Sequence, residues 1–237
     1  MADERIPRIA VVTVGRSPRP DVLAELVGKL GQVRCEEFAT FDDVPTEVLA
    51  EHAPGPREAP FFARLGEGNY VILSVTFVEQ HVARLVARLD DLGYDLIVIA
   101  ATALFAPLRA RTPIVHGQRA VDAWVAALVV GDLKIGLIYP LPRQGDQLAT
   151  FEHRTQFQSA HASINGGYSE HLTEAAGGVS AADLIVMHSI GYTEAMAQLI
   201  VREVGKPVVT ARRIIAAAIR LRLSEIVGRS IGPIIDS

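Results

Sequence analysis

Short apolar runs rich in Val, Ile and Leu alternate along this chain with longer segments whose apolar residues recur at helical spacing. Strands are expected at 9–14, 33–38, 95–101, 113–115, 134–139, 183–188 and 207–210, and a hairpin at 61–65 and 70–77. Helices are expected at 21–30, 78–92, 118–130, 144–158, 168–176, 193–204 and 211–227, with a short one inside 42–60. Strands that alternate with helices predict an α/β protein whose parallel sheets are covered by helices on both faces.

The second half of the chain echoes the first. The segment 95–98 (DLIV) recurs at 183–186, 112–115 (TPIV) corresponds to 206–209 (KPVV), and 8–10 (RIA) corresponds to 134–136 (KIG). Three pairs in the same order predict two pseudo-symmetric, doubly wound lobes that face each other. We expect the first lobe at 1–117 and the second at 118–210, with the final helix, about 211–237, packing back on the first.

Composition narrows the class of protein. Of 237 residues, 49% are hydrophobic, which is ordinary for a chain that buries a core. Lys and Arg number 23 against 27 Asp and Glu, so no broad basic surface for nucleic acid is expected. No apolar stretch approaches the length that crosses a bilayer, and we see no signal peptide. A cytoplasmic protein that binds neither nucleic acid nor membrane is therefore expected.

The strand ends locate a candidate site. Ligands of open α/β sheets bind outside the carboxyl ends of the strands, so two facing lobes would share one cleft. The cleft would be lined by 15–17, 100–103, 139–143 and 188–193. Aligning the repeats on Asp95 and Asp183 sets Ala101 opposite Ser189.

The first strand is followed by Gly15, Arg16 and Ser17, which join it to a helix. Free backbone N–H groups at such a helix start favour an anion, and Arg16 or Arg19 can grip a carboxylate with two hydrogen bonds. The structural alternative is a stable turn with solvated arginines. The segment lacks the further glycines of a dinucleotide-binding turn, and the chain has no P-loop, so we expect no cofactor.

The strand 183–188 ends in polar residues that suit a site. His188 can move a proton near neutral pH, while Ser189, Gly191, Tyr192 and Thr193 can bind a carboxylate. Neighbouring residues of a strand point to opposite faces, so His188 and Ser189 are not expected to act as a base and nucleophile pair. The alternative is that Tyr192 or Thr193 only caps the following helix.

Metal and thiol chemistry find little support. The histidines show no zinc-binding spacing, so no metal site is expected. The single cysteine, Cys35, stands beside Glu36 and Glu37, and two carboxylates would raise the pKa of its thiol. We interpret it as a small strand residue.

Several short motifs, in order, resemble the AroM family, which is related to the aspartate/glutamate racemase group. They are 14–19 (VGRSPR), 51–56 (EHAPGP), 93–97 (GYDLI), 139–144 (YPLPRQ), 190–193 (IGYT) and 207–212 (PVVTAR). The resemblance covers nearly the whole chain. It implies the paired α/β lobes of the racemases, in agreement with the internal repeat.

The resemblance also implies a correction to the racemase chemistry. Those relatives use two cysteines, one from each lobe, to remove and return a proton next to a carboxylate. This sequence has Ala101 and Ser189 at those positions, so the two-thiol mechanism is excluded. Only the binding turns carry over, at 15–17, Thr102 and 191–193, and we add Arg143 as a further carboxylate-binding candidate.

Three hypotheses follow. The first is a cofactor-independent isomerase or lyase acting on a small carboxylate, with His188 and Ser189 as catalytic candidates and Thr102 holding the substrate. The second is a metabolite-binding or regulatory protein that kept the cleft and lost the chemistry. The third is a structural subunit, in which the helices 118–130 and 211–227 form a homodimer interface rather than simply covering the sheets.

Overall fold

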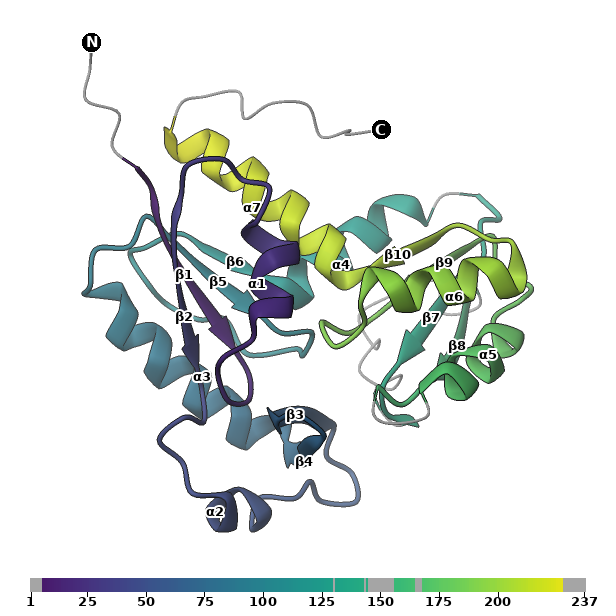
Figure 1. Ribbon diagram of the computed structural model, residues 1–237, viewed down its shortest axis with the longest axis horizontal. Helices are drawn as coiled ribbons and strands as arrows, with labels where there is room; N and C mark the ends of the chain where they lie inside the picture. The colour runs from purple at the N-terminus through teal and green to yellow at the C-terminus, as the bar shows by residue number, and fades with distance from the viewer. Residues whose placement is uncertain (1–5, 130, 143, 145–155, 165–167, 228–237) are drawn as a thin grey trace.

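The computed structural model describes residues 6–129, 131–142, 144, 156–164 and 168–227 (Figure 1). The strands are β1 Arg8–Thr13, β2 Arg34–Ala39, β3 Pro60–Gly66, β4 Asn69–Ser74, β5 Leu96–Ala100, β6 Ile114–His116, β7 Ile135–Tyr139, β8 Phe157–His161, β9 Leu184–Met187 and β10 Val208–Thr210. The helices are α1 Pro20–Val27, α2 Thr46–Ala50, α3 Val75–Asp90, α4 Gly117–Leu128, α5 Tyr168–Gly178, α6 Glu194–Val204 and α7 Ala211–Val227.

The first lobe is built on a parallel sheet of order β2-β1-β5-β6. Its central strand β5 is buried at every position, which explains why it reads as a continuous apolar run. One face of the sheet packs on α3 and the β3–β4 hairpin, and the other on α1, α4 and α7. The predicted α/β class with parallel sheets is therefore confirmed.

The second lobe is built on a parallel sheet of order β10-β9-β7-β8, with α5 and α6 against one face. Strand β8 corrects the sequence analysis, which extended a helix to residue 158. Residues 145–155 of that predicted helix lie outside the described residues. Phe157–His161 is a half-exposed strand at the edge of the sheet, paired with β7. Its polar sequence carries no strand signal, because the pairing with β7 decides its conformation.

The internal repeat is confirmed by topology. The order β2-β1-β5-β6 matches β8-β7-β9-β10 strand for strand, so each predicted pair occupies equivalent places. Asp95 accepts a hydrogen bond from Arg8 N at 2.9 Å, and Asp183 accepts one from Lys134 N at 2.9 Å. The repeated Asp thus fixes the start of the central strand in both sheets.

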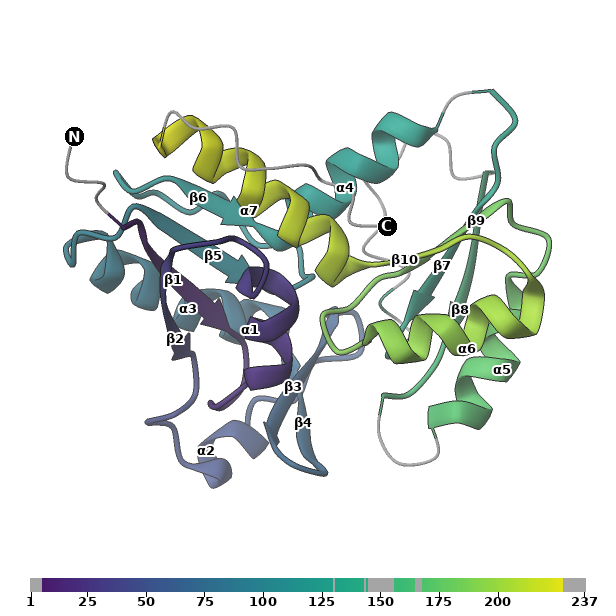
Figure 2. The same cartoon turned by 45° about the horizontal axis from the view of Figure 1, so that its top comes forward.

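The β3–β4 hairpin lies below the first sheet in Figure 2, and a glycine joins the two. Gly15 forms a bridge with Arg64 of β3 at φ 133°, and a Cβ atom at this position would overlap with the Arg64 carbonyl oxygen. The same oxygen accepts a hydrogen bond from Arg16 N at 2.9 Å. Only glycine permits both this backbone angle and this close approach.

The last helix joins the two lobes. After β10 of the second sheet, α7 runs back over the first lobe and packs on α1 and α4 (Figures 1 and 2). Ile215 and Ile219 of α7 share one core cluster with residues of both sheets, Val98 and Leu137 among them. In the part of the chain that the structure describes, no helix is long and apolar enough to cross a membrane.

Candidate functional site

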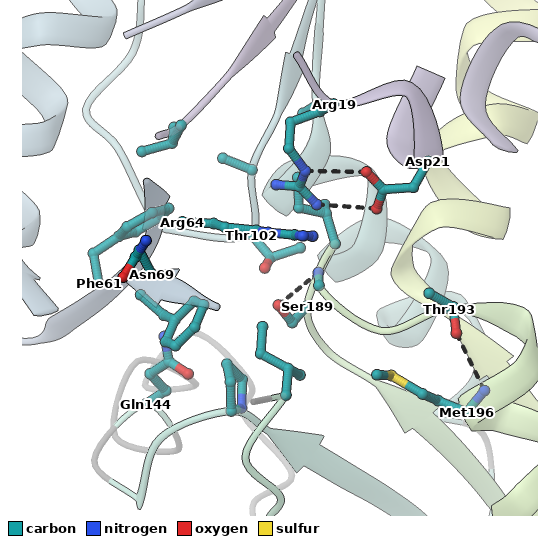
Figure 3. Close-up of a pocket in the computed structure, with 18 of the residues that line it drawn as sticks. Arg19, Asp21, Phe61, Arg64, Asn69, Thr102, Gln144, Ser189, Thr193 and Met196 are labelled. Atoms are coloured by element: carbon teal, nitrogen blue, oxygen red, sulfur yellow. Dashed lines mark hydrogen bonds and ion pairs between the residues drawn. The ribbon is translucent and has the colours of Figure 1, made fainter. Parts of the chain in front are cut away.

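A pocket of about 310 Å³ lies between the two lobes, at the carboxyl ends of the strands (Figure 3). The first lobe contributes the ends of β1 and β5, the start of α1 and the hairpin. The second contributes the segments after β7, β8 and β9 and the start of α6. The lining residues are Val14, Arg19, Asp21, Phe61, Phe62, Arg64, Gly66, Gly68, Asn69, Ala100, Ala101, Thr102, Pro140, Gln144, Ile164, Ser189, Ile190, Gly191, Thr193 and Met196.

Arg64 is the pocket's principal unpaired charge. It extends from the hairpin into the pocket (Figure 3), and its Nε donates to the Gly66 carbonyl oxygen at 3.0 Å. Its terminal nitrogens have no hydrogen-bond or ion-pair partner among the described residues. A half-buried guanidinium with a free edge is suited to a carboxylate, which can accept two parallel hydrogen bonds from it.

Arg19 is the second arginine of the pocket, and its charge is balanced. It pairs with Asp21 through Nε at 3.1 Å and Nη2 at 3.2 Å. Asp21 also accepts from the buried Arg212, at 2.7 Å. Burial alone would raise the pKa of Asp21, but the hydrogen bonds and charges of the two arginines outweigh it and hold the pKa well below its usual range. Asp21 is therefore ionised, and both of its oxygens accept hydrogen bonds from arginines.

Ala101 and Ser189 both line the pocket, one from each lobe. They occupy the same turn after their strands: Ala101 N donates to Ile99 O at 2.9 Å, and Ser189 N donates to Met187 O at 3.0 Å. The Ser189 hydroxyl oxygen accepts from Gly191 N at 3.0 Å, which leaves its proton available to a ligand. Ala101 and Ser189 therefore occupy equivalent places in the two lobes, and both border the pocket.

Two threonines stand at the pocket in different roles. Thr102 donates through its hydroxyl to the His188 carbonyl oxygen at 3.5 Å, linking the ends of β5 and β9. Thr193 is the N-cap of α6, and its hydroxyl oxygen accepts from Met196 N at 3.2 Å. Thr193 therefore caps α6, which was the structural alternative given in the sequence analysis. It also lines the pocket.

His188 does not line the pocket. Its side chain is buried and lies against Tyr139, with ring centroids 4.9 Å apart. Burial lowers the pKa of His188 to about 4, so the ring is neutral at pH 7. Gln118 Nε2 lies 3.2 Å from His188 Nε2 and 2.7 Å from Asp122 Oδ1, and therefore donates to both. The His188 side chain therefore packs inside the protein and does not reach a ligand in the pocket.

The other predicted residues that the structure describes fall outside the pocket, except Gly191, which lines it. Arg16 donates to the carbonyl oxygens of Phe41 and Val44, and Ser17 binds Asp42 through its backbone and hydroxyl, so both fix the loop after β2. Gly15 holds the hairpin, as described above. Tyr192 is fully buried, and its hydroxyl donates to Ala162 O at 2.7 Å. Arg143 lies outside the described residues.

Sequence reasoning missed the contribution of the hairpin and of Met196 in the first turn of α6. No sequence motif marked Arg64, Phe61 or Met196 as site residues. Their place depends on how the hairpin docks and how the lobes face each other, which the local pattern of apolar and polar residues does not determine. Gln144 was placed in a helix but not in the site. Arg19 was one of two alternatives at the first turn, and it is the one that reaches the pocket.

Metal and thiol sites gain no support from the described residues, among which no cluster of three or more His, Cys, Asp or Glu could hold a metal ion. Cys35 lies in β2, away from the pocket. Burial raises the pKa of its thiol to about 11, with Glu37 and Glu36 adding to the effect. Cys35 is a structural residue of the strand.

Two facing parallel sheets with a pocket at their strand ends define the aspartate/glutamate racemase-like fold, and solved structures share it. A liganded mutant of arylmalonate decarboxylase is 15% identical, with a TM-score of 0.59, 92% of each chain being covered. Maleate cis-trans isomerase from Nocardia farcinica is 14% identical, with a TM-score of 0.58 over 93% of this chain and 94% of the other. Glutamate racemase from Bacillus anthracis is 16% identical, with a TM-score of 0.59 over 92% of this chain and 82% of the racemase chain.

The family follows from the sequence. Residues 9–221 match the family described as AroM protein, and the chain belongs to the AroM family. No curated protein sequence matches the chain. At identities near 15%, the likeness to the solved structures shows the fold alone.

Proposed function

We propose that this protein binds a small carboxylate in the pocket between its lobes, without the two-thiol chemistry of its structural relatives. The observation that carries the proposal is the free edge of the Arg64 guanidinium inside the pocket. The charged lining residues in the described chain are Arg19, Arg64 and Asp21, and Asp21 is already engaged. An anion would therefore supply the charge that the pocket lacks.

The size and hydroxyl groups of the pocket support the same ligand class. A volume of about 310 Å³ is at the small end for ligand sites. Ser189 presents a hydroxyl group with a free proton near Arg64 (Figure 3), whereas the Thr102 hydroxyl beside them already donates to the His188 carbonyl oxygen. Among the structural relatives, the maleate isomerases and glutamate racemase have names that specify carboxylates, which agrees with the proposal.

Binding is better supported than proton transfer. Ala101 has no acid or base group, and the Ser189 hydroxyl has no base beside it among the described residues. His188, the leading candidate base of the sequence analysis, is turned away and neutral. A serine hydroxyl without a base is too weak to remove a carbon-bound proton.

The binding proposal is tested by calorimetric titration of a panel of small carboxylates and of the matching neutral amides. We expect at least one carboxylate to bind and its amide not to bind. Arg64→Gln should weaken binding at least about tenfold, because it removes a charged hydrogen-bond pair. Arg84→Gln, an exposed arginine on α3, is the matched control and should leave binding unchanged. Equal binding by Arg64→Gln and the native protein would contradict the proposal.

The second candidate is an isomerase or lyase acting on the same carboxylate. The observation that favours it is the Ser189 hydroxyl, which lines the pocket with its proton free. The resemblance to the racemases implies a cysteine at this position in those proteins. Incubation of the protein with the same panel in D₂O, followed by NMR, detects exchange of the protons next to the carboxylate. Exchange that is lost in Ser189→Ala would support the enzyme, and its absence would leave the binding function.

A further inference from the structure

The pocket has a charged side and an uncharged side: within the described residues, its charged lining side chains all come from the first lobe and its hairpin, which also contribute the apolar Phe61 and Phe62. Arg19, Arg64 and Thr102 come from the first lobe and its hairpin, and they lie together in Figure 3. The second lobe contributes the apolar residues Pro140, Ile164, Ile190 and Met196. In the described part of the second lobe, no Lys, Arg or His lines the pocket.

The polar side chains on the second lobe's side are mostly occupied by backbone groups. Gln144 Oε1 accepts from Leu141 N at 3.2 Å, and its Nε2 donates to Pro60 O at 3.3 Å. The Thr193 hydroxyl oxygen accepts from Met196 N at the start of α6. Gln144 therefore keeps one unused N–H, which is a neutral donor, and it offers no charge to a ligand.

A ligand ammonium group would also lack a partner. Asp21 is the pocket's one carboxylate within the described residues, and both of its oxygens already accept from arginines. A buried ammonium needs an acceptor of opposite charge, and leaving it unpaired is costly. An α-ammonium group at Asp21 would lie beside Arg19 and Arg212, two cations whose charge this carboxylate already helps to balance.

From this division we infer that the ligand is a monocarboxylate with an apolar body and no α-ammonium group. The inference rests on the proposed function and narrows it to one substrate class. The carboxylate lies at Arg64 and Arg19, and the apolar body lies against Pro140, Ile164 and Met196. Dicarboxylates and α-amino acids, which the names of the structural relatives specify, are disfavoured by the same arrangement.

Four ligands of nearly equal shape test this inference. 4-Methylpentanoate ends in two methyl groups where succinate ends in two carboxylate oxygens. Leucine and aspartate are the same two molecules with an α-ammonium group. Dissociation constants are measured by NMR titration of the native protein, with 4-methylpentanamide as the neutral control. We expect 4-methylpentanoate to bind at least about tenfold tighter than the other three, because each of them brings an unpaired charge.

The outcomes separate this inference from the proposed function. If succinate or aspartate binds more tightly than 4-methylpentanoate, the inference is overturned and the carboxylate proposal stands. The same holds if succinate binds and this binding is lost in Arg143→Gln. Leucine binding as tightly as 4-methylpentanoate would overturn the exclusion of the ammonium group. If no carboxylate binds, or if the amide binds as well as the acid, the proposed function itself fails.

A charge placed on the second lobe's side of the pocket gives an independent test. Met196→Lys introduces a cation there with little change in side-chain length, and it should shift the preference from 4-methylpentanoate toward succinate by at least about tenfold. Met196→Gln is the matched uncharged control and should not cause this shift. An unchanged preference in folded Met196→Lys would overturn the proposed orientation. If that variant does not fold, the four-ligand comparison in the native protein still decides.

Discussion

Arg212 Nη2 donates to Asp21 Oδ2 at 2.7 Å, and this contact ties the first turn of α7 to the first turn of α1. Arg212 is 1% exposed and also pairs with Glu25 at 2.8 Å. Its Nε donates to the Ile190 carbonyl oxygen at 2.6 Å, in the segment that carries Ser189 and Gly191 into the pocket. One buried guanidinium therefore connects the two lobes directly behind the site.

Replacing Arg212 should cost substantial stability. In Arg212→Ala the carboxylates of Asp21 and Glu25 and the Ile190 oxygen lose a donor, and removing one partner of a buried pair typically costs 3–5 kcal/mol. Because both carboxylates are partly exposed, we expect a loss of about 3 kcal/mol in the free energy of unfolding, measured by urea denaturation. Arg222→Gln, which breaks the exposed pair with Glu225 on the same helix, should cost less than about 0.5 kcal/mol. Equal losses in the two variants would disprove the role given to Arg212.

A thiol introduced at the pocket should favour a negatively charged reagent. In Ser189→Cys, we compare the rates of alkylation by iodoacetate and by neutral iodoacetamide, followed by mass spectrometry. The ratio of the two rates should be at least about tenfold higher at the introduced thiol than at Cys35, because Arg64 attracts the carboxylate of iodoacetate. The effect should weaken with added salt.

Two controls belong to this measurement. Cys35 is an internal reference for the ratio, although its raised pKa of about 11 makes both reactions slow there. Adding Arg64→Gln to Ser189→Cys should remove most of the preference for iodoacetate. A preference that survives this second change would show that Arg64 is not the group that attracts the anion.

Gly15→Ala should destabilise the protein and weaken ligand binding together. The new methyl group would overlap with the Arg64 carbonyl oxygen, and φ 133° is strained for alanine. We expect a loss of at least about 2 kcal/mol by urea denaturation, with weaker carboxylate binding because the strand that carries Arg64 must move. Gly177→Ala, in an open position on α5, should be neutral or slightly stabilising. If folded Gly15→Ala binds the carboxylate as tightly as the native protein, the contact between Gly15 and the hairpin does not position Arg64 for binding.

Stability should fall as the solution is acidified from pH 7 to pH 5. Burial lowers the pKa of His188 to about 4, and burial together with the charge of Arg119 lowers the pKa of His116 to about 4. An unfolded histidine has a pKa near 6.5, so between pH 4 and 6.5 the unfolded chain binds more protons. Each histidine thus contributes stability that is present above about pH 6.5 and is lost as pH falls toward 4.

We expect a loss of roughly 1 to 2 kcal/mol per buried histidine between pH 7 and pH 5, measured by urea denaturation at each pH. His188→Asn should flatten this part of the profile even though it lowers stability throughout. His171→Asn, on the exposed face of α5, should keep the native profile. A profile of the same slope in His188→Asn would mean that His188 does not take up the proton.

The sequence by itself determined the class of fold and the position of the cleft. Apolar runs such as the one that became β5 predicted buried parallel strands, because local pattern reflects burial on both faces. The repeat of Asp95 at Asp183 predicted the pairing of the lobes, and with it the placement of Ala101 opposite Ser189. The turn after β1 gave Arg19 as one of two candidates, and the cleft prediction gave Thr102.

The tertiary structure alone decided what the pocket contains. Arg64 and Met196 enter it because the hairpin docks on Gly15 and α6 starts at the pocket, which are contacts between residues far apart in sequence. Strand β8 exists because β7 supplies its hydrogen bonds, and the ring of His188 packs beside Tyr139 away from the pocket. Local pattern reports which residues are buried, but the direction of a side chain beyond the end of a strand depends on the neighbours that the folded chain brings to it.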